Sequence, residues 1–303
     1  MINRGAHMEQ LETAQQTKLS PFRQSRGWQQ FRRNRLATLG LVIVLILWGA
    51  TLLAEYVATH DPYEMDLANP FLPIGSQGHL LGTDNFGRDV FSRIIWGGRA
   101  SLTVGIVVVG ISASIGLILG VISGYYGGWI DLVIMRITDL FFAFPFFILA
   151  IGVIAALGPG LQNVMLVLGL VTWPEYARMV RAKTLALREE PFVESARAAG
   201  AKDLRIMFYH ILPNCLGPVI VMATLGMANA ILAAAGLSFL GMGVQPPEPE
   251  WGSMLNEARI YMRTAPHLII IPGMIIMLAV LGLNFLGDGL RDALDPKMPT
   301  ARQ

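Results

Sequence analysis

Long apolar runs alternate with short polar segments over most of this 303-residue chain. A membrane-spanning helix needs roughly 20 consecutive, mostly apolar residues. Six runs reach about this length, and each is bounded by charged residues, glycines or prolines. The runs cover residues 36–54, 100–123, 129–157, 161–180, 214–240 and 264–287. The pattern therefore predicts an all-α membrane protein with six transmembrane helices, so that both termini lie on the same side of the bilayer.

The distribution of basic residues selects that side. If the N-terminus is inside, the inner segments contain 17 of the 23 Lys and Arg residues, and the outer segments contain five. In membrane proteins the cytoplasmic loops carry the excess of Lys and Arg. We therefore expect the N- and C-termini to be cytoplasmic.

These assignments divide the chain into successive segments. We expect a cytoplasmic N-terminal segment, a first transmembrane helix, an extracytoplasmic loop, a five-helix core and a cytoplasmic tail, at residues 1–35, 36–56, 57–98, 99–290 and 291–303. Within the core, a charged cytoplasmic segment at residues 189–213 interrupts the apolar pattern. The polar, basic start shows no cleavable leader, so we expect the first helix to remain as an anchor.

Composition supports the membrane assignment and excludes other classes. The chain is 53% hydrophobic and 15% charged, whereas a soluble domain carries about 25% charged residues. A net charge of +2 is too small to indicate a nucleic-acid-binding protein. The single cysteine, Cys215, excludes an intrachain disulfide, and we expect it to serve packing.

The charged segment predicts a helix that ends at a tight turn. Pro191 suits the first turn of a helix, and Phe192–Ala199 can continue it. Gly200 follows where a helix stops, because glycine adopts positive φ at low cost. Glu194 and Arg197 are three residues apart and can pair on one face.

A second short helix is expected after the turn. Asp203 can cap a helix over Leu204–Ile211. Pro213 then ends this helix or bends it into the fifth span. The small residues Ala196, Ala198 and Ala199 let another surface approach the first helix closely. The segment therefore looks suited to contact with a partner, with a plain cytoplasmic linker as the alternative.

This segment resembles the E-A-A-x3-G-x9-I-x-L-P pattern of the membrane subunits of ATP-binding-cassette importers. Glu194, Ser195 and Ala196 stand at its first three positions, and Gly200 lies six residues after the glutamate. Leu212 and Pro213 follow at the expected distance. The chain departs from the pattern at Ser195, which replaces alanine, and at His210, which stands at the isoleucine position.

Three further motifs are similar to segments of the dipeptide, oligopeptide and nickel permease family, in its C-type subunits. They are "LGTDNFGRDVFSRIIWGGRASLTVG", "LSFLGMGVQPPEPEWGSML" and "GDGLRDALDPK", at residues 81–105, 237–255 and 287–297. We expect "TDNFGRD" to lie outside and to form a short interfacial helix ending at Trp96. We expect "QPPEPEWG" to be a rigid outer connector, or else a surface facing a receptor or the substrate path. "GDGLRDALDP" is expected to be a solvated end helix, with an ATPase contact as the alternative.

The resemblance implies a type I ABC importer permease fold in the bacterial inner membrane. In that family the charged segment is a coupling helix that docks into a groove on an ATPase subunit. The residues matched to this role are Glu194, Ser195, Ala196, Arg197, Ala198, Ala199, Gly200, Ala201, Asp203 and Pro213. The implied partners are a homologous second permease in a heterodimer, two ATP-binding-cassette ATPase subunits and an extracytoplasmic substrate-binding protein. No metal is expected on this chain.

The resemblance also limits the chemistry of this subunit. The chain has no G-x-x-x-x-G-K-[ST] motif, so ATP and Mg are expected on the partner subunits, and this chain is not expected to be an enzyme. Peptides are the expected substrates, with glutathione, nickel chelates and opines as alternatives within the same class. Substrate-binding residues are left open, because the pathway residues are mostly apolar and small and the external receptor would select the substrate.

Two other classes compete with this interpretation. An ion-coupled secondary transporter keeps ionisable groups or broken helices near the membrane midplane. Pro145 and Pro174 could break spans, but no carboxylate is expected near the centre of a span. An intramembrane enzyme is disfavoured, because the chain lacks H-E-x-x-H and G-x-S-x-G motifs and its His210 and His267 are expected at opposite faces.

Charges also stand at the start of the third apolar run. Asp131, Arg136 and Asp139 fall within its first turns. Arg136 and Asp139 are three residues apart, so we expect them to pair on one helix face near the inner membrane surface. A partner contact at the inner mouth of the pathway is the alternative.

Overall fold

The computed structural model describes residues 31–76 and 78–294, and within these residues the regular structure is helical. This confirms the expected all-α class. The expected N-terminal segment and C-terminal tail lie largely outside the described residues, at 1–30 and 295–303. The helices are α3 (Arg35–Leu52), α4 (Ala54–Val57), α5 (Val90–Tyr126), α6 (Gly128–Ala143), α7 (Phe146–Leu157), α8 (Leu161–Arg188), α9 (Pro191–Ala198), α10 (Asp203–Arg205), the π-helix η1 (Ile206–Ile211), α11 (Leu212–Phe239), α12 (Trp251–Ala258), the 3-10 helix η2 (Arg259–Tyr261) and α13 (His267–Leu294).

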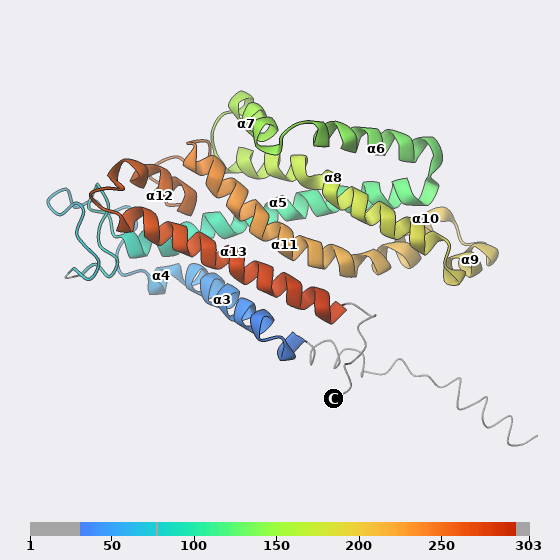
Figure 1. Ribbon diagram of the computed structural model, residues 1–303, viewed down its shortest axis with the longest axis horizontal. Coiled ribbons are helices and arrows are strands. Elements are labelled where there is room, and N and C mark those ends of the chain that lie inside the picture. Colours follow the sequence, from blue (N-terminus) through green and yellow to red (C-terminus); the bar gives the residue numbers. More distant parts are fainter. Residues whose placement is uncertain (1–30, 77, 295–303) are drawn as a thin grey trace, which may run out of the picture.

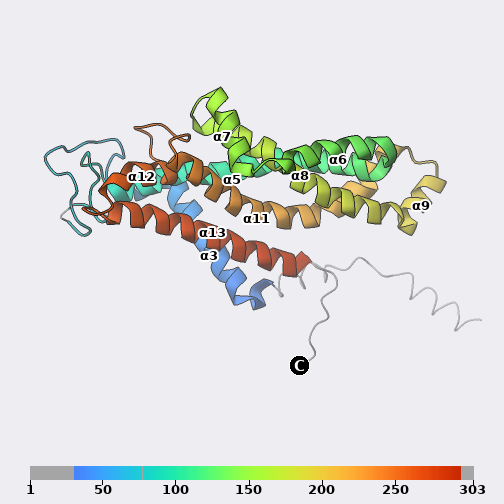
Figure 2. The ribbon, with the colours of Figure 1, turned by 45° about the horizontal axis from the view of Figure 1, so that its top comes forward.

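The longest helices run lengthwise through an elongated molecule (Figures 1 and 2). Helix α9 lies at one extremity, which we call the α9 end. Residues 58–89 and α12 lie at the opposite extremity, which we call the loop end. The start of α3 and the final turns of α13 come together, because the Asn34 side-chain amide donates a 3.2 Å hydrogen bond to Asp292 Oδ2.

Four of the described helices are long and apolar enough to cross a membrane, by length and composition alone. They are α3, α5, the continuous helix over Asp203–Phe239 and α13. Helices α6 and α7 together would give a fifth span, but they meet at a 90° bend. Pro145 caps α7 at this bend, as expected for a residue that disrupts a span. Helix α8 is long enough but too polar to be counted in this way.

Glycines allow the central helices to approach closely. Gly116, Gly120 and Gly124 recur every fourth residue on the face of α5 that meets α8. A Cβ built on Gly120 would lie 2.7 Å from the Ala177 carbonyl oxygen, and one built on Gly124 would lie 2.7 Å from Thr184 Cβ. Small residues at this spacing are typical of packed transmembrane helices, where backbones come into direct contact.

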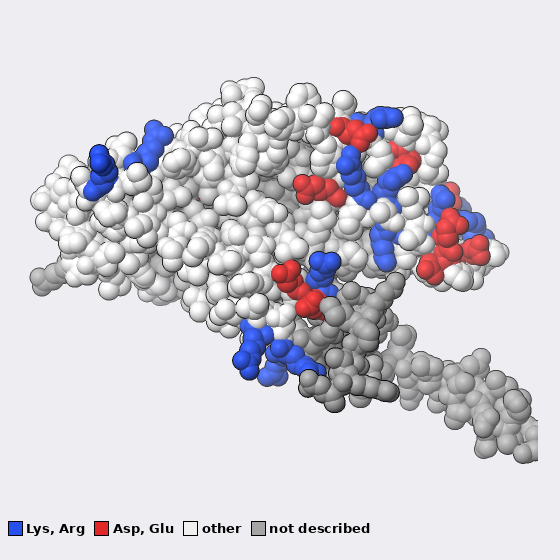
Figure 3. Space-filling view, in the orientation of Figure 1, with Lys and Arg blue, Asp and Glu red and all other residues white. Residues whose placement is uncertain are grey.

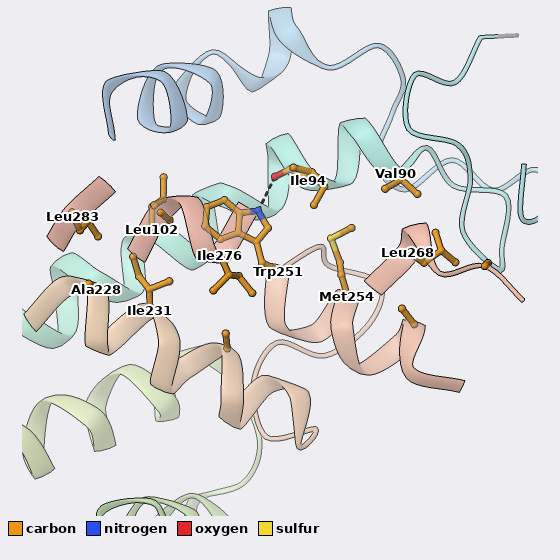
Figure 4. Packing of buried hydrophobic residues seen from close by; sticks show 14 residues of the cluster. Val90, Ile94, Leu102, Ala228, Ile231, Trp251, Met254, Leu268, Ile276 and Leu283 are labelled. Atoms are coloured by element: carbon orange, nitrogen blue, oxygen red, sulfur yellow. Dashed lines mark hydrogen bonds between the residues drawn. The ribbon is translucent and has the colours of Figure 1, made fainter. Parts of the chain in front are cut away.

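The hydrophobic core at the loop end is built around Trp251 (Figure 4). The indole Nε1 donates a 2.9 Å hydrogen bond to the Ile94 carbonyl, and the ring is 1% exposed. The neighbouring Glu250 is also buried, caps α12 through the amides of Gly252 and Ser253, and accepts a 3.0 Å bond from the Ser101 hydroxyl. The "QPPEPEWG" segment therefore ends in a residue pair fixed against α5.

Helix α5 begins earlier than the apolar pattern predicts. It starts at Val90, so the expected short interfacial helix ending at Trp96 is wrong, because these residues belong to one continuous helix. Asp89 sets this start, since its carboxylate accepts a 2.8 Å bond from the Ser92 amide as an N-cap. The helix continues through Arg93 and Arg99, whose guanidinium groups donate to the carbonyls of Pro62 in the loop and Thr51 in α3.

Helix α8 is longer than the apolar pattern predicts. Helix α8 extends to Arg188 rather than to about residue 180, which places Glu175 near its middle. The helix passes through Pro174 without ending, because Pro174 and its neighbours Trp173 and Ala177 are buried in the packed core. Tertiary packing thus overrides the local tendency of proline to break a helix.

Candidate functional site

Helix α9 is a short amphipathic helix that packs through one buried residue, Val193, with the partly buried Ala196 beside it. Pro191 occupies its first turn, as predicted. Val193 is completely buried and packs in a cluster that includes Ile206 and Ile211 from η1. The other side chains of the matched motif, including Glu194 and Ser195, are exposed or only partly buried. The helix is therefore held from one side and leaves its opposite side open.

The turn after α9 has the predicted left-handed glycine. Gly200 has φ +81°. The Ala201 amide donates a 3.1 Å bond to the Ala196 carbonyl, and the Gly200 amide donates a 3.0 Å bond to Arg197, which closes the helix end. No atom lies within 4 Å of a Cβ built on Gly200, so backbone conformation and not space restricts this position.

Asp203 does not cap the second helix, contrary to expectation. Helix α10 begins at Asp203 itself, and the residue before it makes no side-chain cap. The Asp203 carboxylate instead accepts a 2.7 Å hydrogen bond from the Tyr125 hydroxyl at the end of α5. Arg188 adds a 3.2 Å bond to the Tyr125 carbonyl. The turn is thus tied to the ends of α5 and α8.

The second arm of the segment continues directly into the membrane-length helix. A π-helical turn over Ile206–Ile211 joins α10 to α11, and Pro213 lies in the first turn of α11. The wider turn accommodates the proline, which lacks an amide donor. Asn214 supplies a donor here, because its side-chain amide bonds the His210 carbonyl at 2.7 Å. The helix is therefore continuous from Asp203 to Phe239, and the short turn at Gly200 is the segment that joins it to α9.

An exposed apolar and basic surface accompanies this segment, and the sequence reasoning missed it. A shallow groove is lined by Lys202, Leu204, Arg205, Phe208 and Tyr209. Tyr209 is 76% exposed and Leu204 is 63% exposed, so these large side chains do not stabilise the isolated subunit. Phe208 and Tyr209 follow Leu204 by four and five residues, and this helical spacing was the pattern in the sequence that could have indicated a shared apolar face.

The expected pairing within α9 is not observed. Among the ion pairs of the described residues, Glu194 and Arg197 do not contact each other. Both side chains remain exposed. Arg197 instead interacts with the Tyr125 side chain at the end of α5, and Glu194 remains exposed beside it.

Charged side chains gather at the α9 end, over α6, α8 and α9 (Figure 3). Arg136 pairs with Asp139 at 3.5 Å, as predicted, and Arg178 joins them with a 2.7 Å contact to Asp139. Arg181 of α8 forms a two-pronged ion pair with Asp131 of α6. These contacts attach α6 to α8, which agrees with the paired arrangement expected for these charges.

The loop end holds a different, buried set of charges. Arg88 and Arg93 are each 1% exposed and lie between the carboxylates of Asp84 and Glu257. The "TDNFGRD" motif thus provides a tertiary connection between the loop and α12. Buried charges require such partners, because desolvation otherwise makes them costly.

Asp89 lies beside this network with His60 and His79. Burial acts to raise the pKa of Asp89, but hydrogen bonds from the Ser92 amide, His79 and the Ser92 hydroxyl outweigh it and hold the pKa below its ordinary range. The His79 ring contacts Asp89 at 2.9 Å, and the two histidine rings stack with their centroids 4.6 Å apart. The cluster fixes the loop to the first turn of α5.

Comparison with known proteins identifies the family. The model described as binding-protein-dependent transport system inner membrane component matches residues 116–299. The model of the N-terminal transmembrane domain of oligopeptide transport permease C matches residues 20–73. Together these matches cover the first helix, the end of α5 and the helices that follow it.

Named relatives are similar over nearly the whole chain. The dipeptide transport system permease protein DppC of Alkalihalophilus pseudofirmus is 48% identical over 94% of this chain and 92% of its own length. DppC of Haemophilus influenzae is 46% identical over 89% of this chain and 94% of its own length. The glutathione transport system permease protein GsiD of Pectobacterium atrosepticum is also 46% identical, over 89% of this chain and 90% of its own length.

A solved structure shares the fold. A chain of the MetNI methionine ABC transporter, in an inward-facing conformation, superposes with a TM-score of 0.52. The match covers 66% of this chain and 96% of that chain at 23% identity, so it supports the fold alone. Membership of the family is shown by the matched family models and by the relatives named above. The chain therefore belongs to the inner membrane components of binding-protein-dependent transport systems.

Proposed function

We propose that this permease subunit forms half of a translocation pathway for dipeptides or oligopeptides. The pathway belongs to an importer powered by ATP on separate subunits. The observation that carries the proposal is the helix–glycine turn–helix at the α9 end, which bears the matched motif and continues into α11. The family and the named relatives support the transporter class.

The α9 segment is the proposed contact with an ATPase subunit. Its buried side is anchored through Val193, while its motif residues and the groove beside Tyr209 are open to a partner. Leu204, Phe208 and Tyr209 add apolar contact area that the isolated subunit does not use. Motion of the ATPase groove would pass through the π-turn into α11.

Membrane orientation and assembly are part of the same proposal. The α9 end faces the cytoplasm, where the ATPases bind, and the loop end faces outward toward a substrate-binding protein. Helices α3, α5, α6–α7, α8, α11 and α13 then supply six spans, with α8 protected from lipid by its neighbours and by a homologous second permease in a heterodimer. The bacterial inner membrane is the location that this arrangement requires.

Peptides are the proposed cargo. The relatives named above are dipeptide permeases at 48% and 46% identity and a glutathione permease at 46% identity. Glutathione is itself a small peptide, so these names share one substrate chemistry. Nickel chelates and opines are the competing cargo within the same transporter class.

A competition experiment tests the cargo. The complex with its receptor is placed in proteoliposomes, and ATP-dependent entry of labelled dialanine is measured. We expect excess unlabelled dipeptide to compete strongly and a nickel chelate to compete little. Competition by the nickel chelate alone, with no dialanine entry, would contradict the peptide assignment.

Crosslinking tests the ATPase contact. A photoreactive thiol probe is attached to an Ala198→Cys variant of the assembled complex. The resident Cys215 is buried, so it should not compete for the probe. We expect a crosslink to the ATPase, and we expect none from a Thr264→Cys control at the loop end. Crosslinks from the control alone would reverse the proposed orientation.

A further inference from the structure

A cavity of about 370 Å³ opens between α5, α8 and α11 beside the start of α7. This volume lies in the range of small-molecule sites, roughly 300–1,000 Å³. Most of its lining is apolar, as in Val108, Leu168 and Met222. Ser112, Thr172, Glu175, Tyr176 and Asn229 supply polar groups. An apolar cavity with a few polar groups is the usual form of a site for a small organic ligand.

Glu175 is the charged member of this lining. It lies near the middle of α8, and its neighbours Tyr176 and Ala177 are buried against α5. Within the part of the chain that the structure describes, no hydrogen bond or ion pair is found for the Glu175 carboxylate. Arg178 and Arg181, one turn further along α8, are already paired with Asp139 and Asp131 of α6.

An unpaired carboxylate at this position needs an explanation. A charged group facing lipid is costly, so ionisable residues within membrane helices face water-filled cavities or partners and mark functional pathways. The exposed side of Glu175 opens onto the cavity. The cavity is therefore the environment in which the charge of Glu175 is tolerated. A ligand group that binds this carboxylate must be positively charged or a strong hydrogen-bond donor.

We propose that Glu175 receives the α-ammonium group of the transported peptide as it passes through this subunit. This inference rests on the proposed function and adds a binding site to it. A peptide zwitterion offers one ammonium group, which forms charge-assisted hydrogen bonds with a carboxylate. Thr172 and Asn229 lie in the same lining and can meet the polar backbone of the peptide.

The chemistry of the lining suits passage rather than tight retention. The site has a single charge and largely apolar walls, so binding is weak enough for the cargo to leave. It is also indifferent to the peptide side chains, because the ammonium group is common to all of them. Glu175 is thus a positioning group for a class of cargo, while selection among peptides remains with the receptor.

A substitution series at this position tests the inference in the full complex. Receptor-dependent uptake of labelled dialanine and receptor-stimulated ATP hydrolysis are measured for Glu175→Asp, Glu175→Gln and Glu175→Lys. We expect uptake to fall in that order, with a loss of about tenfold or more for Glu175→Gln, the size expected for a hydrogen bond to a charged group. ATP hydrolysis and the yield of assembled complex should stay near wild type.

Matched measurements separate this inference from the proposed function. Glu55→Gln removes an exposed carboxylate on α4, outside the cavity, the receptor-facing loop end and the α9 segment, and should leave uptake unchanged. Wild-type uptake that does not depend on ATP would refute the proposed function. Uptake by Glu175→Gln equal to wild type would overturn the inference alone. Loss of the second permease from the Glu175→Gln complex would also overturn it, because Glu175 would then pair with that subunit.

Discussion

The guanidinium Nη2 of Arg88 lies 2.6 Å from Glu257 Oε2, although 169 residues separate the two in sequence. This contact attaches the loop over residues 58–89 to α12. Arg93 approaches the same carboxylate at 3.6 Å, so one acidic group serves two buried cations. Buried ion pairs thus add to the hydrophobic core at the loop end.

Removal of Glu257 should therefore destabilise the loop end. Glu257→Ala leaves Arg88 and Arg93 with only Asp84 as an acidic partner, and breaking a buried pair typically costs about 3–5 kcal/mol. We expect a lower midpoint of thermal unfolding for the detergent-solubilised complex. Glu248→Ala, at an exposed position nearby, is the control and should not shift the midpoint. Equal midpoints for both variants would show that the network contributes nothing.

Acid should weaken the attachment of the loop to α5. The folded-state pKa of Asp89 lies below its ordinary value of 3.8. The ionised carboxylate therefore contributes stability above that value, and this stability is lost as the pH falls through the lower, folded-state pKa. We expect hydrogen exchange at the first turn of α5 to rise below about pH 4. Asp89→Asn should show raised exchange already at neutral pH and little further change; a wild-type-like acid response in this variant would contradict the assignment.

The turn at Gly200 should tolerate asparagine better than valine. Its φ of +81° is left-handed, and a β-branched residue there costs about 1–2 kcal/mol, whereas asparagine visits this region more readily. We expect Gly200→Val to leave the complex assembled but to reduce uptake by roughly five- to thirtyfold, the population change for that energy. Gly200→Asn should retain most of the uptake. Normal transport by Gly200→Val would refute a coupling role for this turn.

The close packing of α5 on α8 can be tested by the same substitution at two glycines of α5, one in the contact and one outside it. A Cβ on Gly120 would lie 2.7 Å from both the Ala177 carbonyl oxygen and Val180 Cβ, whereas nothing lies within 4 Å of one on Gly110. Gly120→Val should destabilise the subunit by about 1–3 kcal/mol through overpacking. Gly110→Val should have a much smaller effect. The comparison is made by thermal unfolding of the purified subunit in detergent, and reversal of the order would contradict the packing described.

Features that depend on neighbouring residues could be predicted from the sequence. The position of Pro191 in the first turn of α9 and the left-handed Gly200 follow from local backbone chemistry, and both are confirmed. The all-helical class follows from the apolar runs. The Arg136–Asp139 pair follows from helical spacing in the same way.

Features that depend on distant residues could not be predicted. Local sequence allows the Asp203 carboxylate either to cap its own helix or to accept a hydrogen bond from elsewhere. Only the fold brings the Tyr125 hydroxyl, 78 residues away in sequence, within 2.7 Å of it. The length of α8 is set by packing against α5, so the central place of Glu175 was missed. Phe208 and Tyr209 are apolar residues of a membrane protein, and sequence alone does not show that they remain exposed.

The energy source for uptake is the measurement that tests the central claim most directly. The purified complex and its receptor are placed in proteoliposomes, and labelled dipeptide entry is compared with ATP present and with a proton or sodium gradient imposed instead. The account predicts entry with ATP, no entry with either gradient alone, and the reduced ATP-driven entry given above for Gly200→Val. Entry driven by a gradient without ATP would contradict the role of the α9 segment as the contact for an ATPase.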